Sequence, residues 1–194
     1  MFVRTISESE ATGAVAEIYR AEKAEMGVVM AATECWTARP DLLPAWPDFF
    51  NRVRAGFTLS GRDWRLITII AAKRVPSTYC AHVYGRRLLD DLGSKAAVVA
   101  VLNDYRNAGL SDREVEMLRF ANLVATNASK TTKADIDRLR AAGFSDPQIS
   151  DIALCAALRC LLSRFVDAMG ASPEAQFLDP DEDFRRALTV GKPV

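Results

Sequence analysis

The sequence predicts an all-α protein, and three observations support this fold class. Apolar residues recur every three or four positions along most of the 194 residues, which is the period of an amphipathic helix. Prolines, glycines and capping serines stand at the boundaries of these periodic segments. No segment alternates apolar with polar residues, and no Asn-Gly pair marks a hairpin, so we expect no β-strand.

Two helices are expected before residue 60. The first covers 10–25, with charges on one side and Val15, Ile18 and Tyr19 on the other. A Met- and Ala-rich stretch over 26–38 follows it. Pro40 suits the first turn of the next helix, whose apolar positions are Leu42, Leu43, Trp46, Phe49, Phe50 and Val53.

The next two helices are separated by a proline. Ser60 is expected to cap the first of them together with Asp63, three residues later. The segment that follows is almost wholly apolar, so this helix should be buried on most sides. Pro76 ends it, and a new helix is expected to start near Ser77 or Thr78.

Two later boundaries have the same plan, in the segments 108–115 and 142–149. In each, a glycine ends one helix, a serine caps the next, and Glu114 or Gln148 completes a capping box. The offset of 34 residues is also compatible with a helical repeat, but the intervening helices differ, which favours shared turn chemistry.

The last long helix, over 148–169, has apolar residues on more than one face, so we expect it to be central. We expect residues 1–194 to form a single domain with a helical core over 10–175. The remaining tail, 176–194, should wrap the surface or a neighbouring subunit, with a short helix near 181–188.

Composition narrows the classes of function. Hydrophobic residues make up 49% of the chain, enough for one compact core, and 25 basic residues balance 25 acidic ones. A net charge of zero provides no strong field to gather nucleic acid or an anionic membrane. The N-terminus lacks the apolar segment of a signal peptide, and apolar runs stop short of the ~20 residues of a membrane span. We therefore expect a cytoplasmic protein with neither kind of partner.

Cysteine and histidine usage argues against a metal site. The four cysteines do not suggest a secreted disulfide scaffold. They lack zinc-site spacing as well, since Cys155 and Cys160 lie five residues apart on one predicted helix and the chain has a single histidine. We expect no metal and no other cofactor.

The stretch STYCAHVY, residues 77–84, concentrates the reactive side chains. On a helix that starts near residue 77, Ser77, Cys80 and Tyr84 share one face. His82 lies nearly opposite, so it is poorly placed to activate the Cys80 thiol. A histidine bonded to a carbonyl group or placed at an interface is the simpler interpretation.

This pattern resembles the alkylhydroperoxidase D-like and carboxymuconolactone decarboxylase superfamily. The resemblance lies in the long apolar helix after Leu59-Ser60, the break, and Tyr79-Cys80 at the start of the next helix. Residues 38–53 and 139–174 resemble segments of its peroxidase-related members, so that the resemblance covers roughly 10–175. It implies an alkylhydroperoxidase D-like helical bundle that is a homo-oligomer and acts on a small-molecule substrate.

The site residues of the family fall on changed positions. The peroxidase branch has C-x-x-C-x-x-x-H with a glutamate twelve residues before the first cysteine. These positions fall on Ser77, Cys80, Tyr84 and Arg65, so only Cys80 is kept. The decarboxylase branch has Y-E-W-x-x-H, where Tyr79 matches, Cys80 replaces the glutamate and Tyr84 replaces the histidine.

The replacements remove the two-thiol redox cycle. Ser77 cannot form a disulfide. Tyr84, with an ordinary pKa near ~10, is a poor base at neutral pH, and Arg65 cannot accept a proton. One hypothesis is a peroxidase-related enzyme that uses Cys80 alone, with Arg65 stabilising the thiolate. A second thiol would then come from Cys35, Cys155, Cys160 or an external molecule.

Two other hypotheses remain open. In one, the protein is a cofactor-free acid/base enzyme (a decarboxylase, isomerase or lyase) on a small carboxylated metabolite. Arg65 would anchor the carboxylate, Tyr79 would contact the substrate, Tyr84 and His82 would donate protons or hydrogen bonds, and Asp63 would be the base. Asp63 also suits a helix N-terminus. In the other hypothesis, the chain is a non-catalytic binding or structural member of the family.

Overall fold

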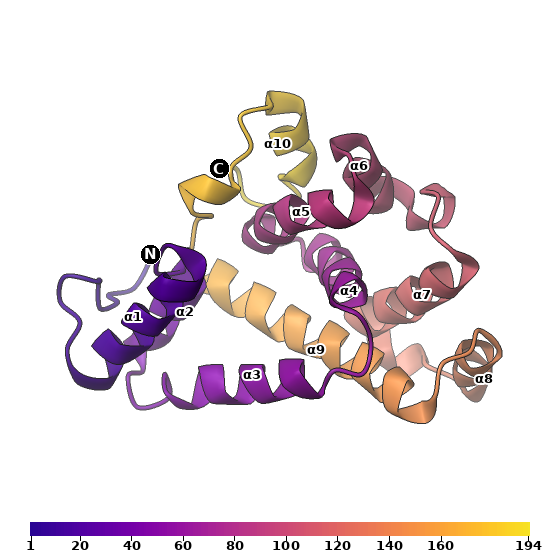
Figure 1. The fold of residues 1–194 in the computed structure, drawn as a ribbon, viewed down its shortest axis with the longest axis horizontal. Coiled ribbons are helices and arrows are strands. Elements are labelled where there is room, and N and C mark those ends of the chain that lie inside the picture. The colour runs from indigo at the N-terminus through magenta and orange to yellow at the C-terminus, as the bar shows by residue number, and fades with distance from the viewer.

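The all-α expectation is confirmed. A computed structural model describes all 194 residues and contains ten α-helices and no strand (Figure 1). The helices are α1 Gly13–Met26, α2 Ala31–Cys35, α3 Ala45–Gly56, α4 Gly61–Arg74, α5 Thr78–Leu92, α6 Lys95–Asp104, α7 Asp112–Asn127, α8 Lys133–Ala141, α9 Asp146–Met169 and α10 Glu182–Leu188. Four short 3₁₀ segments join them: Trp36–Ala38, Tyr105–Asn107, Ala128–Lys130 and Ala175–Phe177. No helix is both long and apolar enough to cross a bilayer.

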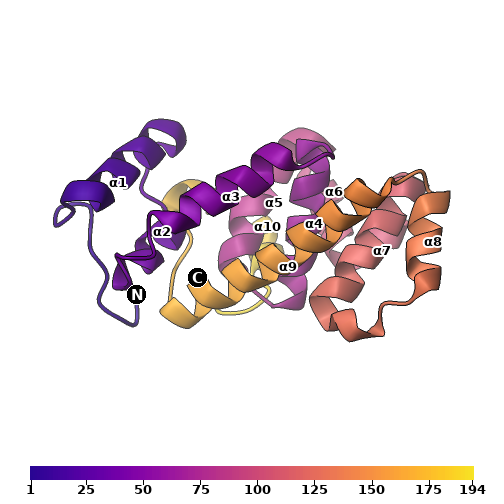
Figure 2. The same ribbon diagram turned by 90° about the horizontal axis from the view of Figure 1, so that it is seen from below.

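Helix α4 is the centre of the bundle. It packs against α5, α7 and α9, and Figure 1 shows these helices around it. Leu66, Ile67 and Ile69 are fully buried, so the expectation of burial on most sides is confirmed. Helices α1 and α2 lie at one end of the long axis and α8 lies at the other (Figure 2).

The serine caps expected from the sequence are present. Ser60, Ser111 and Ser145 each accept a hydrogen bond from the backbone N–H three residues later, and each belongs to a capping box. Gly109 and Gly143 precede two of these caps with φ of +71° and +86°, a left-handed conformation that favours glycine.

The expected start of the helix at Pro40 is wrong. Helix α3 begins at Ala45, and residues 40–44 form turns. A helix that began at Pro40 would need an N–H from Pro44, which proline lacks. Pro44 instead precedes the helix and Pro47 falls in its first turn, where no intrahelical N–H bond is required.

Helix α9 is less central than expected. Ile152, Ala156 and Val166 are fully buried, but Leu154 and Leu161 are 42% and 51% exposed. The helix therefore packs through one broad face and presents apolar side chains on the other. Apolar side chains on several faces of a helix do not by themselves require central burial.

The C-terminal segment covers the side of α5 that carries Gly85. Helix α10 packs on α5 and α6. Leu188 is fully buried against Gly85, where an added Cβ would lie 2.5 Å from a Leu188 methyl group. The buried carboxylate of Asp179 accepts hydrogen bonds from Arg86 at 2.8 Å and from Lys95 at 2.6 Å, which attaches the segment before α10 to the bundle.

Candidate functional site

The break between α4 and α5 positions the reactive helix. Pro76 lies between the two helices, and the Ser77 N–H donates to the Ala72 carbonyl at 2.8 Å. The buried Ser77 hydroxyl then accepts from the Cys80 N–H at 3.4 Å and caps α5. Serine at this position therefore has a structural use, and it orients the first turn that carries Cys80.

Cys80 meets an arginine from α9. The Arg159 Nη2 atom donates to Cys80 Sγ at 3.5 Å, and the Arg159 guanidinium carbon lies 4.5 Å from the centroid of the Tyr84 ring. Cys80, Tyr84 and Arg159 are 1%, 4% and 3% exposed. Cys80 and Tyr84 thus lie on one face of α5 as expected, but the guanidinium beside them belongs to Arg159 and not to Arg65.

Arg65 is directed elsewhere. Its Nε and Nη2 atoms donate to the two carboxylate oxygens of Asp91 at 2.5 and 2.7 Å. A bidentate pair of this kind satisfies both side chains. Arg65 does not line the cavity described below, so the expectation that it contacts Cys80 or a substrate carboxylate is wrong.

Asp63 and His82 also lie away from the thiol. The Asp63 carboxylate accepts from the Ser60 N–H at 3.0 Å and from the Ser60 hydroxyl at 2.8 Å, as a helix cap. His82 Nε2 lies 3.4 Å from Thr189 Oγ1, on the side covered by the C-terminal segment. Burial lowers the pKa of His82, and Arg185 lowers it further. The helical spacing that set His82 opposite Cys80 explains this placement.

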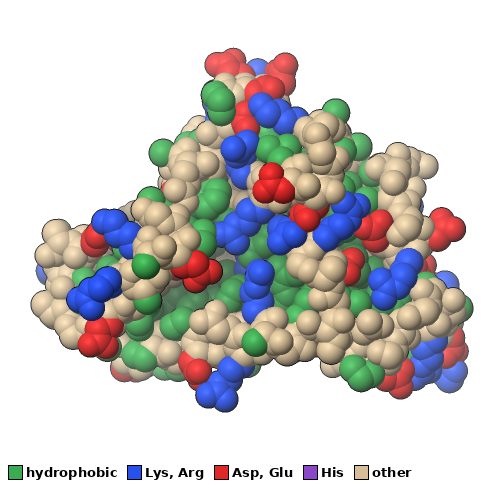
Figure 3. Space-filling view, in the orientation of Figure 1, with side chains coloured by type: hydrophobic (Ala, Val, Ile, Leu, Met, Phe, Trp, Pro, Cys, Tyr) green, Lys and Arg blue, Asp and Glu red, His purple; other side chains and the backbone are tan.

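A cavity of about 390 Å³ opens beside the thiol. Five helices line it: α1, α2, α3, α5 and α9. Figure 3 shows this hollow between α1, α2 and α3, with apolar side chains on its floor and charged side chains around it. Tyr79, Tyr84 and Arg159 lie on its wall, whereas Cys80 does not. Arg159 is therefore the group that touches both the cavity and the sulfur.

Tyr79 is held as a neutral hydrogen-bond donor. Its hydroxyl donates to Glu174 Oε1 at 3.0 Å and accepts from the Ala32 N–H at 3.2 Å. Burial and the neighbouring Glu174 carboxylate raise its pKa well above the ordinary value. At this end of the cavity, Glu22 accepts from the Met30 N–H at 2.9 Å and from the Thr33 hydroxyl, and burial raises the pKa of Glu22.

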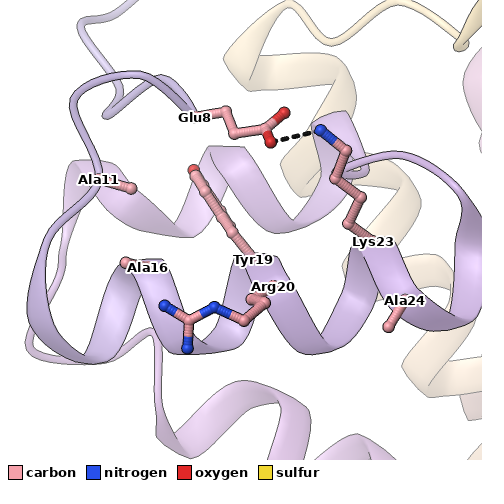
Figure 4. Close-up of a pocket in the computed structure, with 7 residues that line it drawn as sticks. All are labelled: Glu8, Ala11, Ala16, Tyr19, Arg20, Lys23 and Ala24. Carbon is pink, nitrogen blue, oxygen red and sulfur yellow. Dashed lines mark hydrogen bonds and ion pairs between the residues drawn. The ribbon is translucent and has the colours of Figure 1, made fainter.

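A second depression, of about 400 Å³, lies on α1 and the segment before it (Figure 4). Lys23 and Glu8 form an exposed ion pair at 2.5 Å across it. The Tyr19 hydroxyl donates to the Ile6 carbonyl at 2.7 Å, and burial raises the pKa of Tyr19 to about 12. These polar groups already have partners, and no thiol lines the depression. The cavity beside Arg159 is therefore the better candidate site.

Sequence reasoning missed Arg159. The signal was a single cation within the apolar run from Ile152 to Leu162, on a helix expected to be buried. A buried arginine requires partners, so this position was as strong a candidate as Arg65. No cluster of three metal-binding side chains is present in the structure.

Solved structures of similar fold cover most of this chain. A peroxidase-related protein from Ralstonia eutropha JMP134, described as an alkylhydroperoxidase AhpD core, has a TM-score of 0.80 and 22% identity over 91% of this chain and 93% of its own. A peroxidase-related protein from Silicibacter sp. TM1040 has a TM-score of 0.78 and 21% identity over 91% of both chains.

A third similar structure is that of the debrominase Bmp8, as a cysteine-to-alanine variant in complex with 2,3,4-tribromopyrrole. It has a TM-score of 0.76 and 20% identity over 97% of this chain and 95% of its own. By sequence, no protein-family profile and no curated protein matches. The chain thus has the alkylhydroperoxidase D-like fold that its sequence pattern implied, and shares it with these peroxidase-related proteins.

Proposed function

We propose that this protein is a small-molecule enzyme of the alkylhydroperoxidase-like class that uses Cys80 as the only thiol of its site. The observation that carries the proposal is the 3.5 Å contact between Arg159 Nη2 and Cys80 Sγ. Positive charge next to a cysteine is typical of reactive cysteines, which act as nucleophiles. No carboxylate of the protein forms a salt bridge with Arg159, and its only side-chain hydrogen bond is the one to Cys80.

The chemistry needs an external reductant. The Cys80 thiolate attacks the terminal oxygen of an organic hydroperoxide, the O–O bond breaks, and the alkoxide leaves as an alcohol after it takes up a proton. Cys80 is thereby oxidised to a sulfenic acid. One external thiol displaces water from the sulfenic acid and forms a mixed disulfide. A second thiol releases Cys80, leaving the external thiols as a disulfide.

The cavity supports an organic substrate. Trp46, Phe50, Tyr79 and Tyr84 supply four aromatic side chains to its wall. Ligand cavities are predominantly apolar, with a few placed polar groups. The debrominase of similar fold was captured as a cysteine-to-alanine variant with a brominated pyrrole, which is compatible with a small ring compound near a cysteine in this fold.

Thiol counting after peroxide treatment tests the proposal. The native protein is treated with cumene hydroperoxide, quenched and unfolded before titration, because all four cysteines are buried and free. Wild type should lose one thiol, Cys80→Ser should lose none, and the matched control Cys160→Ser should lose one like wild type. An unchanged count in wild type, or a loss that persists in Cys80→Ser, would overturn the proposal.

An acid/base enzyme on a carboxylated metabolite is the second candidate. The Tyr84 ring stacked against Arg159 favours it, because a cation and a phenol then face the cavity together. Arg159 takes the anchoring part first expected of Arg65. Turnover that survives in Cys80→Ala and is lost in Tyr84→Phe would select this candidate. A protein that neither turns over substrate nor binds one would point to a structural member of the fold.

The homo-oligomer expected from the resemblance stays a prediction. Phe49 and Leu161 are 49% and 51% exposed on α3 and α9. Single exposed apolar side chains are common in monomers as well. Sedimentation velocity at two concentrations is the direct measurement, and a single species of 21.3 kDa would contradict the expectation.

A further inference from the structure

The arginines that line the cavity have no acidic partner. Arg54, Arg87 and Arg159 are on its wall, and none of them forms a salt bridge. Other arginines of the bundle do: Arg62 pairs with Glu114 at 2.8 Å and Arg65 pairs with Asp91 at 2.5 Å. The positive charge in this cavity is therefore uncompensated, although the chain as a whole is neutral.

Arg159 is the most deeply buried of these three arginines. It is 3% exposed, and its Nε–H has no hydrogen-bond partner. Its only hydrogen bond is to the Cys80 sulfur, and its guanidinium also lies over the Tyr84 ring. Burying a cation without an anion is costly, and the cost is offset when a partner neutralises it. An anion supplied from the cavity would do so.

A second cation, Arg87, also lies near the Tyr84 ring. The Arg87 guanidinium carbon lies 5.5 Å from the centroid of the Tyr84 ring, and its Nη2 atom donates only to the Met26 sulfur, at 3.4 Å. Arg87 and Arg159 thus approach one aromatic ring from two helices. Cation–π contacts hold them in place without removing their charge.

The two glutamates of the cavity do not neutralise these cations. Glu22 is engaged by the Met30 N–H and by the Thr33 hydroxyl. Glu25 lies at the exposed rim, and neither glutamate forms an ion pair with an arginine. An anionic ligand would be repelled at the α1 side and attracted at the α9 side, which orients it with its acidic group toward Arg159.

We infer that the cavity binds a small aromatic carboxylate, with Arg159 as its counter-ion. The planar guanidinium suits a planar carboxylate, and it has N–H groups that the Cys80 sulfur does not use. The ring of the ligand would lie among Trp46, Phe50 and Leu162, which line the same space. The volume of about 390 Å³ is within the ~300–1,000 Å³ of small-molecule sites. This inference rests on the proposed function for its site and adds the class of molecule bound there, which under the single-thiol mechanism is a hydroperoxide that carries an aromatic carboxylate.

Calorimetric titration with 1-naphthoate and with its neutral analogue 1-naphthamide tests the inference. Wild type should bind the carboxylate at least about tenfold more tightly, because hydrogen bonds to a charged partner are the stronger kind. Arg159→Gln should abolish this preference, and Arg159→Lys should keep part of it. Arg113→Gln is the matched control, since Arg113 stacks on Phe144 outside the cavity and should leave binding unchanged.

Two further measurements keep the test decisive. If Arg159→Gln does not fold, Arg87→Gln should still reduce the preference several-fold. Binding of 1-naphthoate and 1-naphthamide by Cys80→Ser is the second measurement, because a preference for the carboxylate that persists in this variant depends on Arg159 and not on the thiol. Equal affinity of wild type for the carboxylate and the amide, or no binding of either, overturns the inference. If the protein binds the carboxylate but Cys80 does not react with peroxide, the inference is supported and the single-thiol mechanism is refuted.

Discussion

Replacing Arg159 with methionine is expected to stabilise the protein while it removes the activity. Methionine keeps most of the apolar stem and deletes the charge. The residue is 3% exposed and has no acidic partner, so the folded state holds a cation that has lost most of its contact with water. Arg159 would then contribute to activity while it destabilises the folded state.

The expected change in the free energy of unfolding can be worked out from the contacts of Arg159. Desolvation of one ion costs several kcal/mol in a real protein. The stack on Tyr84, at 4.5 Å, returns about 2 kcal/mol, and the hydrogen bond to Cys80 returns about 1 kcal/mol. Replacement of buried ionic groups by apolar ones is often neutral or stabilising by about 1–4 kcal/mol. Because the shorter side chain also leaves a void, we expect a gain of about 1–2 kcal/mol.

Urea unfolding measures this difference. The midpoint should rise in Arg159→Met with an unchanged slope, since the surface exposed on unfolding hardly changes. Arg113→Met, which removes a half-buried cation from the face of Phe144, should stay within about 0.5 kcal/mol of wild type. A loss of more than about 2 kcal/mol in Arg159→Met would refute the reasoning, because it would show that the guanidinium stabilises the fold.

Three further outcomes are expected. Burial raises the pKa of the Cys155 thiol to about 12, so at pH 8 about one molecule in 10⁴ carries the Cys155 thiolate. Iodoacetamide should therefore label Cys155 far more slowly than free cysteine, as measured by mass spectrometry. Equal labelling rates would contradict this prediction. Burial lowers the pKa of His82. The unfolded chain therefore takes up a proton first as the pH falls below about 6.5, and the unfolding free energy should drop there by up to ~1.4 kcal/mol per pH unit, a slope that should be missing in His82→Gln. In Gly191→Ala the new Cβ would collide with the Pro76 carbonyl oxygen, so hydrogen exchange in the C-terminal segment should accelerate, whereas Gly56→Ala, with open space around it, should leave exchange unchanged.

Helix boundaries followed from the sequence wherever the determining groups are a few residues apart. The capping boxes at Ser111 and Ser145 and the break at Pro76 are interactions within one turn of helix. The wrong start at Pro40 came from weighing the first proline without the second. Pro44 removes an N–H that a helix from Pro40 would need, so the same local rule, applied twice, places the start at Ala45.

The face of the reactive helix was also predictable, but its partners were not. Helical spacing placed Cys80 with Tyr84 and set His82 on the opposite side, and the structure has them so. Arg65 was expected at the thiol because it occupies the position of a family glutamate. The long side chain of Arg65 can reach several neighbouring residues, and in the structure it pairs with Asp91.

What the sequence by itself determined is therefore local: the helical class, the serine caps, the break that starts α5, and the set of side chains on each face of that helix. Only the tertiary structure decided which cation meets the thiol. Cys80 and Arg159 are 79 residues apart, and their contact depends on how α5 and α9 pack in the bundle. Periodicity specifies which residues share a face of one helix, whereas the angle and depth at which two helices meet arise from the packing of the whole core.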